Sequence, residues 1–467
     1  MPTEGYVDVV VIGGGPGGYV AAVRAAQLGG RVILVEKEEL GGTCANRGCI
    51  PTKALLEIME FYSMIKQAEH FGIAVQGASP RLDAMIERKN AIVRELVKGI
   101  DYLLKRNGVQ FIKGTGRIAS PESVQILNVS GDIVVKTKSI VIATGSEPAK
   151  LPIPNVDSAG VITSSEALDL REVPKSILIV GGGAVGLEFA SIFSELGSET
   201  TVVEMMPHIL PNEDEEIAST LEKILRKKGI AILTKSKVIS ISGNRDGIKA
   251  ATLLREGKEV VVQTEKILVA TGRSPNIHGL NAENIGVKID KGAIVVNNRM
   301  ETSVLGIYAV GDVVGKFMLA HVAMAEGTTA AENALGKESY IDYKVIPRCT
   351  YTSPEVACVG LPEGKAQEQG YDVVAGKFPL VASGRAATLG ERSGLVKIVC
   401  DKNSREILGV HMIAPHASEL IHEATLAMKL EATVDDVASL IHAHPTLAEA
   451  IKEAALDVDR KAVHNPR

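Results

Sequence analysis

The sequence predicts an α/β fold in which one unit of strand, turn, helix and strand occurs twice. An apolar run at residues 7–12 leads into a glycine-rich turn, and residues 176–180 begin the same arrangement again. Short apolar runs separated by helical segments are typical of strands in a parallel sheet. Two later apolar runs, 140–145 and 267–272, both end in Ala-Thr-Gly, which indicates that each closes one of two related domains.

The first glycine turn carries the complete pattern of a dinucleotide-binding, Rossmann-like domain. In this pattern Gly13 allows the tight bend, Gly15 lets a pyrophosphate approach the helix N-terminus, and Gly18 lets the helix pack on the strand. The helix is expected at residues 19–26, and the second strand ends at Glu36, whose carboxylate can accept hydrogen bonds from ribose hydroxyl groups. The glycines alone would indicate only a turn, but the whole unit favours a dinucleotide site.

The second copy contains Gly181, Gly183 and Gly186, and its second strand ends at Glu204. The acid has the same spacing from the third glycine in both copies, so two dinucleotides are expected. Residues 205–207 contain no arginine that could meet a 2′-phosphate, and the Glu204 carboxylate would repel one. The second site is therefore predicted to bind NAD rather than NADP.

Cys44 and Cys49 follow the first unit with four residues between them. In a regular helix their Cα atoms would be roughly 8.6 Å apart, whereas a disulfide spans about 4.4–6.8 Å. We therefore expect a local break at Gly48, with Pro51 near the start of a helix that continues through residues 54–59. The positive N-terminal end of that helix would favour thiolate over thiol in the pair.

The spacing of Cys44 and Cys49 alone leaves other interpretations open. Two thiols at this spacing can be buried and inert, or they can bind zinc. Structural zinc needs four ligands, however, and no second Cys or His cluster of suitable spacing lies nearby, so no metal site is expected. The position of the pair beside a dinucleotide turn favours a redox-active disulfide held next to a redox cofactor.

The composition is that of an ordinary globular protein. The chain has 467 residues, of which 45% are hydrophobic and 23% charged, which suggests about three domains. A net charge of −5 and an aromatic content of 3% argue against a nucleic-acid surface. The most apolar stretch, 177–193, contains Glu188 and several glycines, so no membrane span is expected. Five scattered cysteines and an N-terminus without an apolar leader favour the cytoplasm.

Together these motifs resemble those of the pyridine nucleotide–disulfide oxidoreductases over essentially the whole chain, and most closely the branch that oxidises dihydrolipoamide. The resemblance rests on the turns at Gly13 and Gly181, on Cys44 and Cys49, and on residues 308–312, 319–321 and 442–449. It implies FAD at the first site, NAD(P)H at the second and a C-terminal α+β dimerisation domain that forms a homodimer. The predicted domains are an FAD-binding domain at 1–148, an NAD-binding domain at 149–275, a central segment returning to the FAD domain at 276–345, and an interface domain at 346–467.

The resemblance also implies roles for single residues near the cofactors. Lys53 lies one helical turn after Cys49, and the resemblance implies that it sits near the flavin N5 and pairs with Glu188. Its cation would stabilise reduced, anionic flavin, although a lysine here could also be only a surface residue. Asp312 matches the aspartate that bonds the ribityl chain. Further cofactor contacts are implied at Gly116, Ala320, Val238 and Gly272.

An acid–base residue is expected in the C-terminal motif, where His444 precedes Pro445 and lies five residues before Glu449. Taken alone, this pair would be structural. Beside a redox-active disulfide, an imidazole that titrates near neutral pH suits proton transfer to and from thiols, and the carboxylate would orient the ring. The resemblance places the base directly before the proline, which disfavours His442, and implies that His444 serves the cysteines of the opposite subunit.

The implied reaction is oxidation of protein-bound dihydrolipoamide, with Cys44 exchanging with lipoyl sulfur, Cys49 against the flavin, and NAD reduced to NADH. The implied partner is a lipoylated protein of a 2-oxo acid dehydrogenase complex or a glycine cleavage system. The alternatives are a glutathione- or mercuric-reductase-like enzyme and a docking subunit. Mercuric reductase and large thioredoxin reductase use C-terminal redox residues, which are missing after Cys400, and glutathione-type reductases usually take NADP.

Three residues depart from the common pattern of this family. Arg47 stands between the two cysteines where a small apolar residue is more usual, and Arg348 and Cys349 replace a serine and a small apolar residue. These changes bear on rate and redox potential more than on reaction type. We predict that Cys349, Cys358 and Cys400 are buried structural thiols.

Overall fold

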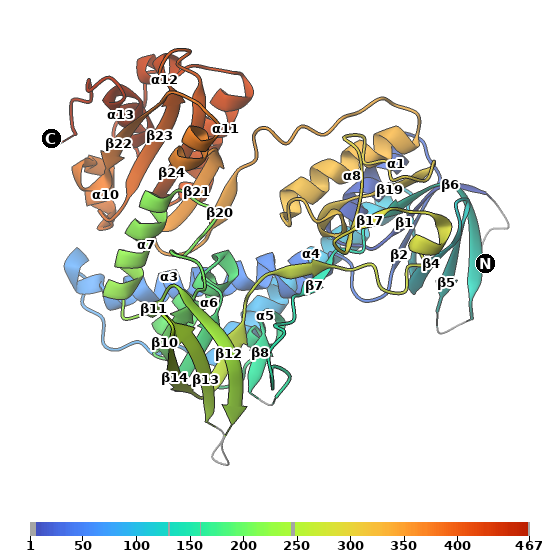
Figure 1. The fold of residues 1–467 in the computed structure, drawn as a ribbon, viewed down its shortest axis with the longest axis horizontal. Coiled ribbons are helices and arrows are strands. Elements are labelled where there is room, and N and C mark those ends of the chain that lie inside the picture. The colour runs from blue at the N-terminus through green and yellow to red at the C-terminus, as the bar shows by residue number, and fades with distance from the viewer. Residues whose placement is uncertain (1–5, 129–130, 159, 244–247, 466–467) are drawn as a thin grey trace. The chain divides into compact units, whose positions relative to one another are not determined.

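The structure is a computed structural model that describes residues 6–128, 131–158, 160–243 and 248–465. The outermost residues of the predicted first and last domains lie outside these ranges. The chain forms two compact units (Figure 1). Unit 1 comprises Met1–Leu55, Asp83–Ala149 and Gly272–Asp342, and unit 2 comprises Leu56–Leu82, Lys150–Thr271 and Tyr343–Arg467. Two helices, α3 (Cys49–Lys66) and α4 (Leu82–Arg106), begin in one unit and end in the other.

Unit 1 is built on a mixed seven-stranded sheet. Its strand order is β3 (Gln110–Lys113), β2 (Val32–Glu36), β1 (Val7–Ile12), β6 (Ile133–Ile142), β5 (Ser123–Leu127) and β4 (Thr115–Ser120), and β19 (Ile307–Ala309) pairs with β6. Strands β1, β2, β3, β6 and β19 run parallel, whereas β5 pairs antiparallel with both β6 and β4. The central parallel strands are almost wholly apolar because they are covered on both faces.

Helix α1 (Pro16–Gln27) follows β1 and packs against α8 (Ala320–Ala334). The two helices approach closely because both carry glycine at the contact. A Cβ atom at Gly327 would lie 2.3 Å from the carbonyl oxygen of Gly17, so any side chain there would push the helices apart. The shorter elements of unit 1 are α2 (Gly42–Arg47), β7 (Ser146–Pro148), β16 (Arg273–Pro275), η2 (Glu283–Ile285), β17 (Ile289–Asp290), β18 (Ala293–Ile294) and η3 (Gly311–Val314).

Unit 2 contains a five-stranded parallel sheet of the same design as the β1 region. Its order is β11 (Ala231–Leu233), β10 (Glu199–Val203), β9 (Ser176–Val180), β15 (Lys266–Val269) and β8 (Val161–Thr163). A three-stranded antiparallel sheet packs on it through apolar side chains, with β12 (Ser236–Gly243), β13 (Lys249–Arg255) and β14 (Lys258–Thr264). The helices here are α5 (Ser164–Ala167), α6 (Ala184–Glu195) and α7 (Glu215–Lys227).

The rest of unit 2 is a five-stranded antiparallel sheet with helices around it. Its order is β20 (Arg348–Thr350), β21 (Glu355–Gly360), β24 (Ile407–Ala414), β23 (Leu395–Asp401) and β22 (Val373–Pro379). The surrounding elements are α9 (Glu363–Glu368), η4 (Leu380–Ala382), α10 (Gly384–Leu389), α11 (Ala417–Lys429), α12 (Val434–Ser439) and α13 (Glu449–Asp457), and η1 (Ala68–Phe71) follows α3. Side chains of the strands and of α11 and α13 form its apolar core.

The predicted α/β fold is confirmed, including both repeated units, but two helix starts differ from the prediction. Helix α1 begins at Pro16, before the predicted residue 19, because proline fits the first helical turn. Helix α3 begins at Cys49, ahead of Pro51. Proline lacks an amide proton, but the amides of the first helical turn have no acceptor within the helix, so nothing is lost there. The division into four domains stays a prediction.

No helix in the described part of the chain combines the length and the apolar character that a bilayer span requires.

Candidate active site

The glycine turn of unit 1 divides its glycines into two kinds. A Cβ atom at Gly13 would lie 2.2 Å from the Ala143 carbonyl oxygen, and one at Gly18 would lie 1.9 Å from the Gly13 carbonyl oxygen. These two glycines are therefore required by the packing of the protein itself. A Cβ atom at Gly15 would meet only one atom, at 3.9 Å, so the space beside it is open. That open space, at the N-terminus of α1, suits the approach of a pyrophosphate.

The turn of unit 2 repeats this geometry. A Cβ atom at Gly181 would lie 2.4 Å from the Ala270 carbonyl oxygen, and one at Gly186 would lie 2.0 Å from the Gly181 carbonyl oxygen. A Cβ atom at Gly183 would meet nothing within 4 Å. Among the three motif glycines of each copy, the second one, Gly15 or Gly183, is therefore the one that could carry a Cβ atom without a clash with the protein.

The predicted ribose-binding acids are buried and held by backbone amides. Gly14 N–H and Glu38 N–H each donate to Glu36 at 2.7 Å. Glu204 accepts from Gly182 N–H at 2.7 Å and from Met206 N–H at 2.8 Å. Each carboxylate keeps free lone pairs for a ribose diol, and its position at the strand end is fixed by these bonds.

The cysteine pair lies where two helices meet. Helix α2 ends at Arg47 and α3 begins at Cys49. Gly48 between them interrupts the helical conformation, with φ −138° and ψ −112°. The predicted break is thereby confirmed. The two cysteines carry separate thiol groups in this structure.

The two thiol groups are not equivalent. Their mutual hydrogen bond and burial raise the pKa of Cys44 far above its ordinary value, and the nearby Lys53 charge only partly opposes this. The expected preference for thiolate is thus wrong for Cys44, because donation to Cys49 keeps its proton in place.

Arg47 forms an ion pair with Glu38 in the loop that follows β2. Both side chains are about half exposed. The arginine that stands between the cysteines in the sequence is therefore bound to a carboxylate of the same unit.

Asp312, which the sequence predicted, has two polar partners that the sequence did not reveal, Ser146 and Arg273. Asp312 lies in η3, and Ser146 Oγ donates to its carboxylate. Arg273 Nε donates to Ser146 Oγ at 2.6 Å, and its Nη2 donates to the Ser146 carbonyl at 2.6 Å. Ser146 and Arg273 each follow an Ala-Thr-Gly, and β7 and β16, which begin at these residues, pair with each other. The repeated tripeptide was the signal that could have found them.

The other predicted cofactor residues take varied positions. Gly116 lies in β4, where a Cβ atom would meet Ile12 at 2.9 Å, and Ala320 begins α8. Val238 is buried in the core between β12 and the parallel sheet, so only its backbone is available to a ligand. Gly272 has a left-handed φ of 109° with open space beside it.

Lys53 and Glu188 belong to different units, and their pairing stays a prediction. Lys53 lies in unit 1, one turn after Cys49 in α3. Glu188 is buried in α6 of unit 2, and its Oε1 accepts from Tyr351 N–H at 3.1 Å.

His444 and Glu449 form the hydrogen-bonded pair that the sequence predicted. His444 Nδ1 lies 2.8 Å from Glu449 Oε1, and Thr446 N–H donates to Glu449 Oε2 at 2.8 Å. Burial alone would raise the pKa of Glu449, but these two partners outweigh it and lower the pKa. With Nδ1–H donating to the carboxylate, Nε2 can accept a proton, and the His444 side chain is 78% exposed.

His442 differs from His444 in its surroundings. Its Nε2 lies 2.9 Å from Glu423 Oε1 in α11, and its side chain is only 5% exposed. His444 is thus the more exposed of the two side chains, and its assignment as the base stays a prediction.

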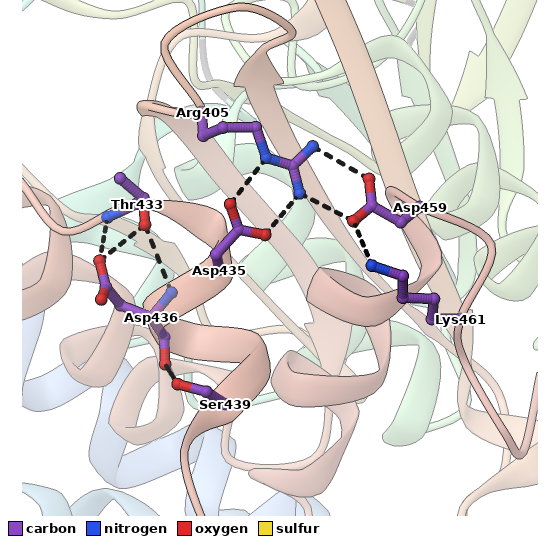
Figure 2. Close-up of polar contacts among 7 residues, drawn as sticks. All are labelled: Arg405, Thr433, Asp435, Asp436, Ser439, Asp459 and Lys461. Carbon is purple, nitrogen blue, oxygen red and sulfur yellow. Dashed lines mark hydrogen bonds and ion pairs between the residues drawn. The ribbon is translucent and has the colours of Figure 1, made fainter.

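The loop that carries both histidines joins α12 to α13, and Arg405 ties these two helices together (Figure 2). The guanidinium group contacts Asp435, in the first turn of α12, at 2.9 and 2.7 Å. It also contacts Asp459, just beyond α13, at 3.0 and 3.1 Å. Thr433 caps α12 through a reciprocal pair of bonds with Asp436. The far ends of the two helices are thereby fixed to one turn of the sheet.

The other cysteines lie in the C-terminal sheet. Cys358 and Cys400 are fully buried, as predicted. Cys349 is only half-buried, so the prediction was wrong for this residue, because β20 is an edge strand of the sheet.

Comparisons with known proteins agree with this arrangement. The family model described as "Pyridine nucleotide-disulphide oxidoreductase" matches residues 7–327, and its dimerisation domain matches residues 346–455. The chain is 45% identical over 476 aligned positions to "Dihydrolipoyl dehydrogenase" of Bacillus subtilis, covering 99% of this chain and 100% of the relative. A relative from Thermus scotoductus with the same name is 46% identical, covering 98% of each chain.

Solved structures show the same fold. The "HOCl-induced flavoprotein disulfide reductase RclA from Escherichia coli" has a TM-score of 0.85 and 29% sequence identity, covering 96% of this chain and 99% of that chain.

Proposed function

Because the chain belongs to the pyridine nucleotide-disulphide oxidoreductases, we propose that it is an FAD- and NAD-dependent dihydrolipoyl dehydrogenase. The balanced reaction is dihydrolipoamide plus NAD⁺ giving lipoamide, NADH and H⁺. The substrate assignment is carried by near-full-length identity of 43–46% to dihydrolipoyl dehydrogenases, since the site geometry alone would fit many disulfide substrates.

The residues of the two turns fit the two cofactors. The turn at Gly15, with Glu36 and Asp312, would hold FAD, and the turn at Gly183, with Glu204, would hold NAD. When bound, FAD supplies two-electron chemistry between the dithiol and the nicotinamide. The open space beside each middle glycine supports this assignment, because a side chain would occupy the place of a pyrophosphate.

The chain's own residues carry out the thiol chemistry. His444 Nε2 takes the proton from one lipoyl thiol, while Glu449 holds the ring and stabilises its cation. The resulting thiolate attacks Cys44, the Cys44–Cys49 bond breaks, and its electron pair stays on Cys49. His444 then gives its proton to Cys44 and takes the proton of the second lipoyl thiol. That thiolate attacks the lipoyl sulfur of the mixed disulfide, and Cys44 leaves with the electron pair of the broken bond as a thiol. The raised pKa of Cys44 keeps this proton there.

The homodimer and the partner are further parts of the proposal. A dimerisation domain at residues 346–455 supports a homodimer in which His444 serves the cysteines of the second subunit. The partner would be the lipoylated protein of a 2-oxo acid dehydrogenase complex or a glycine cleavage system. The cytoplasmic location also stays a proposal, supported by five scattered cysteines.

NADH formation from dihydrolipoamide and NAD⁺ tests the function directly. We expect turnover with dihydrolipoamide, and little with NADPH plus glutathione disulfide or Hg²⁺. Full activity of a Cys44→Ser variant would contradict the mechanism. Turnover with glutathione disulfide or Hg²⁺ but not with dihydrolipoamide would replace the substrate assignment.

A further inference from the structure

A row of five side chains crosses the C-terminal sheet of unit 2. In the strand register, Arg348 lies opposite Cys358, and Cys358 lies opposite His411. His411 lies opposite Lys397, which in turn lies opposite Lys377. Residues directly opposite each other on antiparallel strands point to the same face of a sheet. The row therefore places a thiol and an imidazole side by side between cationic side chains.

Carboxylates from the start of α7 lie over this row. Arg348 Nε and Nη2 donate to the two oxygens of Glu213, each at 2.9 Å. Lys397 Nζ contacts the two oxygens of Asp214 at 3.0 and 2.9 Å, and both side chains are almost fully buried. These ion pairs join the nucleotide-type region to the sheet, and Cys358 and His411 lie between them.

One ring nitrogen of His411 takes part in none of these contacts. Its side chain is fully buried, and Nε2 lies 2.9 Å from the Leu361 carbonyl oxygen. A carbonyl only accepts, so Nε2 carries the proton and Nδ1 of the neutral ring has a lone pair. Among the described residues, Nδ1 has no hydrogen-bond partner. A buried polar atom without a partner is costly and calls for an explanation.

Three potential metal ligands meet at this point. A ring nitrogen of His411, Sγ of Cys358 and a carboxylate oxygen of Glu213 all lie within 4.8 Å of one another. We propose that Glu213, Cys358 and His411 form a Zn²⁺ site with three protein ligands, in which a water molecule is the fourth ligand. Tetrahedral zinc holds such ligands roughly 3.3–3.6 Å apart, so small side-chain shifts would close the site around the ion.

The surroundings of the three ligands have the features of a metal site. The Leu361 carbonyl accepts from Nε2 and so fixes the tautomer that frees Nδ1, as acceptors hydrogen-bonded to the other ring nitrogen do for zinc-bound histidines. Arg348 orients Glu213, and each carboxylate oxygen keeps a second lone pair for the metal.

The local charge balance also tolerates a divalent cation. Lys397 is surrounded by three carboxylates, those of Asp214, Glu216 and Glu363, at 2.9, 3.3 and 2.8 Å. This cluster carries more negative than positive charge. Its surplus offsets the positive charge that Arg348 would add to a neutral zinc–thiolate–carboxylate centre.

Zinc binding would replace the thiol proton of Cys358 with a zinc–sulfur bond and release one proton, with no change of oxidation state. Because the ion displaces this proton, its affinity should rise with pH. The ion would cross-link strands β21 and β24 to the segment ahead of α7, independently of the thiol chemistry at Cys44 and Cys49.

The test uses the holoenzyme with the Cys44–Cys49 disulfide oxidised, so that the active-site sulfurs do not bind metal. After chelator treatment, Zn²⁺ is titrated against a chromophoric chelator. We expect one ion per chain and one sulfur ligand in the zinc X-ray absorption spectrum. The Cys358→Ser variant should lose at least tenfold in affinity, whereas the Cys349→Ser control should bind as the unaltered chain does.

Several results would overturn the zinc site. These are no binding at micromolar Zn²⁺, unchanged affinity of Cys358→Ser, or a zinc spectrum without sulfur. Loss of zinc from a Cys44→Ser variant would also overturn it, because the ion would then belong to the redox pair. If Cys358→Ser fails to fold, the spectrum of the unaltered chain still decides.

Discussion

At the scale of single residues, the site separates groups of the same type by their surroundings. Cys44 holds its proton because it donates to Cys49. His444 is exposed, whereas His442 is enclosed. Thus two thiols and two imidazoles that lie close in sequence acquire different chemistry from burial and hydrogen bonding alone.

Replacement of His444 by Gln should lower turnover with dihydrolipoamide by about 10²–10⁴-fold, because the proton acceptor is lost. Steady-state NADH formation measures this effect. Oxidation of NADH by an artificial electron acceptor should stay within about twofold, since it needs no thiol deprotonation. A variant that retains dihydrolipoamide turnover would exclude His444 as the base.

At the scale of elements, each glycine turn contains glycines that the packing of the fold requires and one glycine that leaves space for a ligand. Gly183→Ala should fold normally, because a Cβ atom there meets nothing within 4 Å. Its affinity for NAD should fall about tenfold or more, because the methyl group occupies the pyrophosphate approach. Titration of NADH fluorescence measures this affinity.

Gly186→Ala is the matched control in the same turn. Its Cβ atom would lie 2.0 Å from the Gly181 carbonyl oxygen, so we expect poor folding rather than a selective loss of NAD binding. A Gly183→Ala variant with unchanged NADH affinity would remove the argument for a nucleotide at this turn.

Arg405, with its partners Asp435 and Asp459, forms a cluster that links α12 to the end of α13 (Figure 2). Arg405→Ala should lower the free energy of unfolding by roughly 1 kcal/mol, since two helix ends lose their common partner. Lys461→Ala is the control, because Lys461 is largely exposed and contacts only Asp459 in this cluster. Urea unfolding compares the two variants, and equal stability of both would show that the cluster contributes nothing.

At the scale of the whole molecule, buried ion pairs tie the nucleotide-type region of unit 2 to the C-terminal sheet. Asp214→Asn should lower the free energy of unfolding by roughly 2 kcal/mol, less than for an isolated buried pair because Glu216 and Glu363 also contact Lys397. Glu368→Gln, in the exposed pair with Lys365, should change it by under about 0.5 kcal/mol.

The pH dependence of this contribution follows from the sign of the shift. Burial alone would raise the pKa of Asp214, but the hydrogen bonds and charge of Lys397 and the Glu363 N–H lower it below its ordinary value. The stabilisation is therefore complete above the unfolded pKa of about 3.9 and is lost as pH falls through the lower folded pKa. Acid unfolding should accordingly differ less between Asp214→Asn and the unaltered chain as pH falls below about 4. A constant difference would contradict this assignment.

The sequence by itself determined the features whose residues lie within one local pattern. The two glycine turns, their terminal acids, the break at Gly48 and the His444–Glu449 pair were all predicted, because each depends on a short stretch of backbone geometry. The family also followed from these patterns.

Only the tertiary structure decided the features that depend on strand register and burial. Ser146 and Arg273 meet because β7 pairs with β16, and Cys358 meets His411 because β21 pairs with β24. The same holds for the exposure of Cys349 and for the raised pKa of Cys44. Residues far apart in sequence become partners only when the chain closes its sheets, and a local pattern carries no information about that closure.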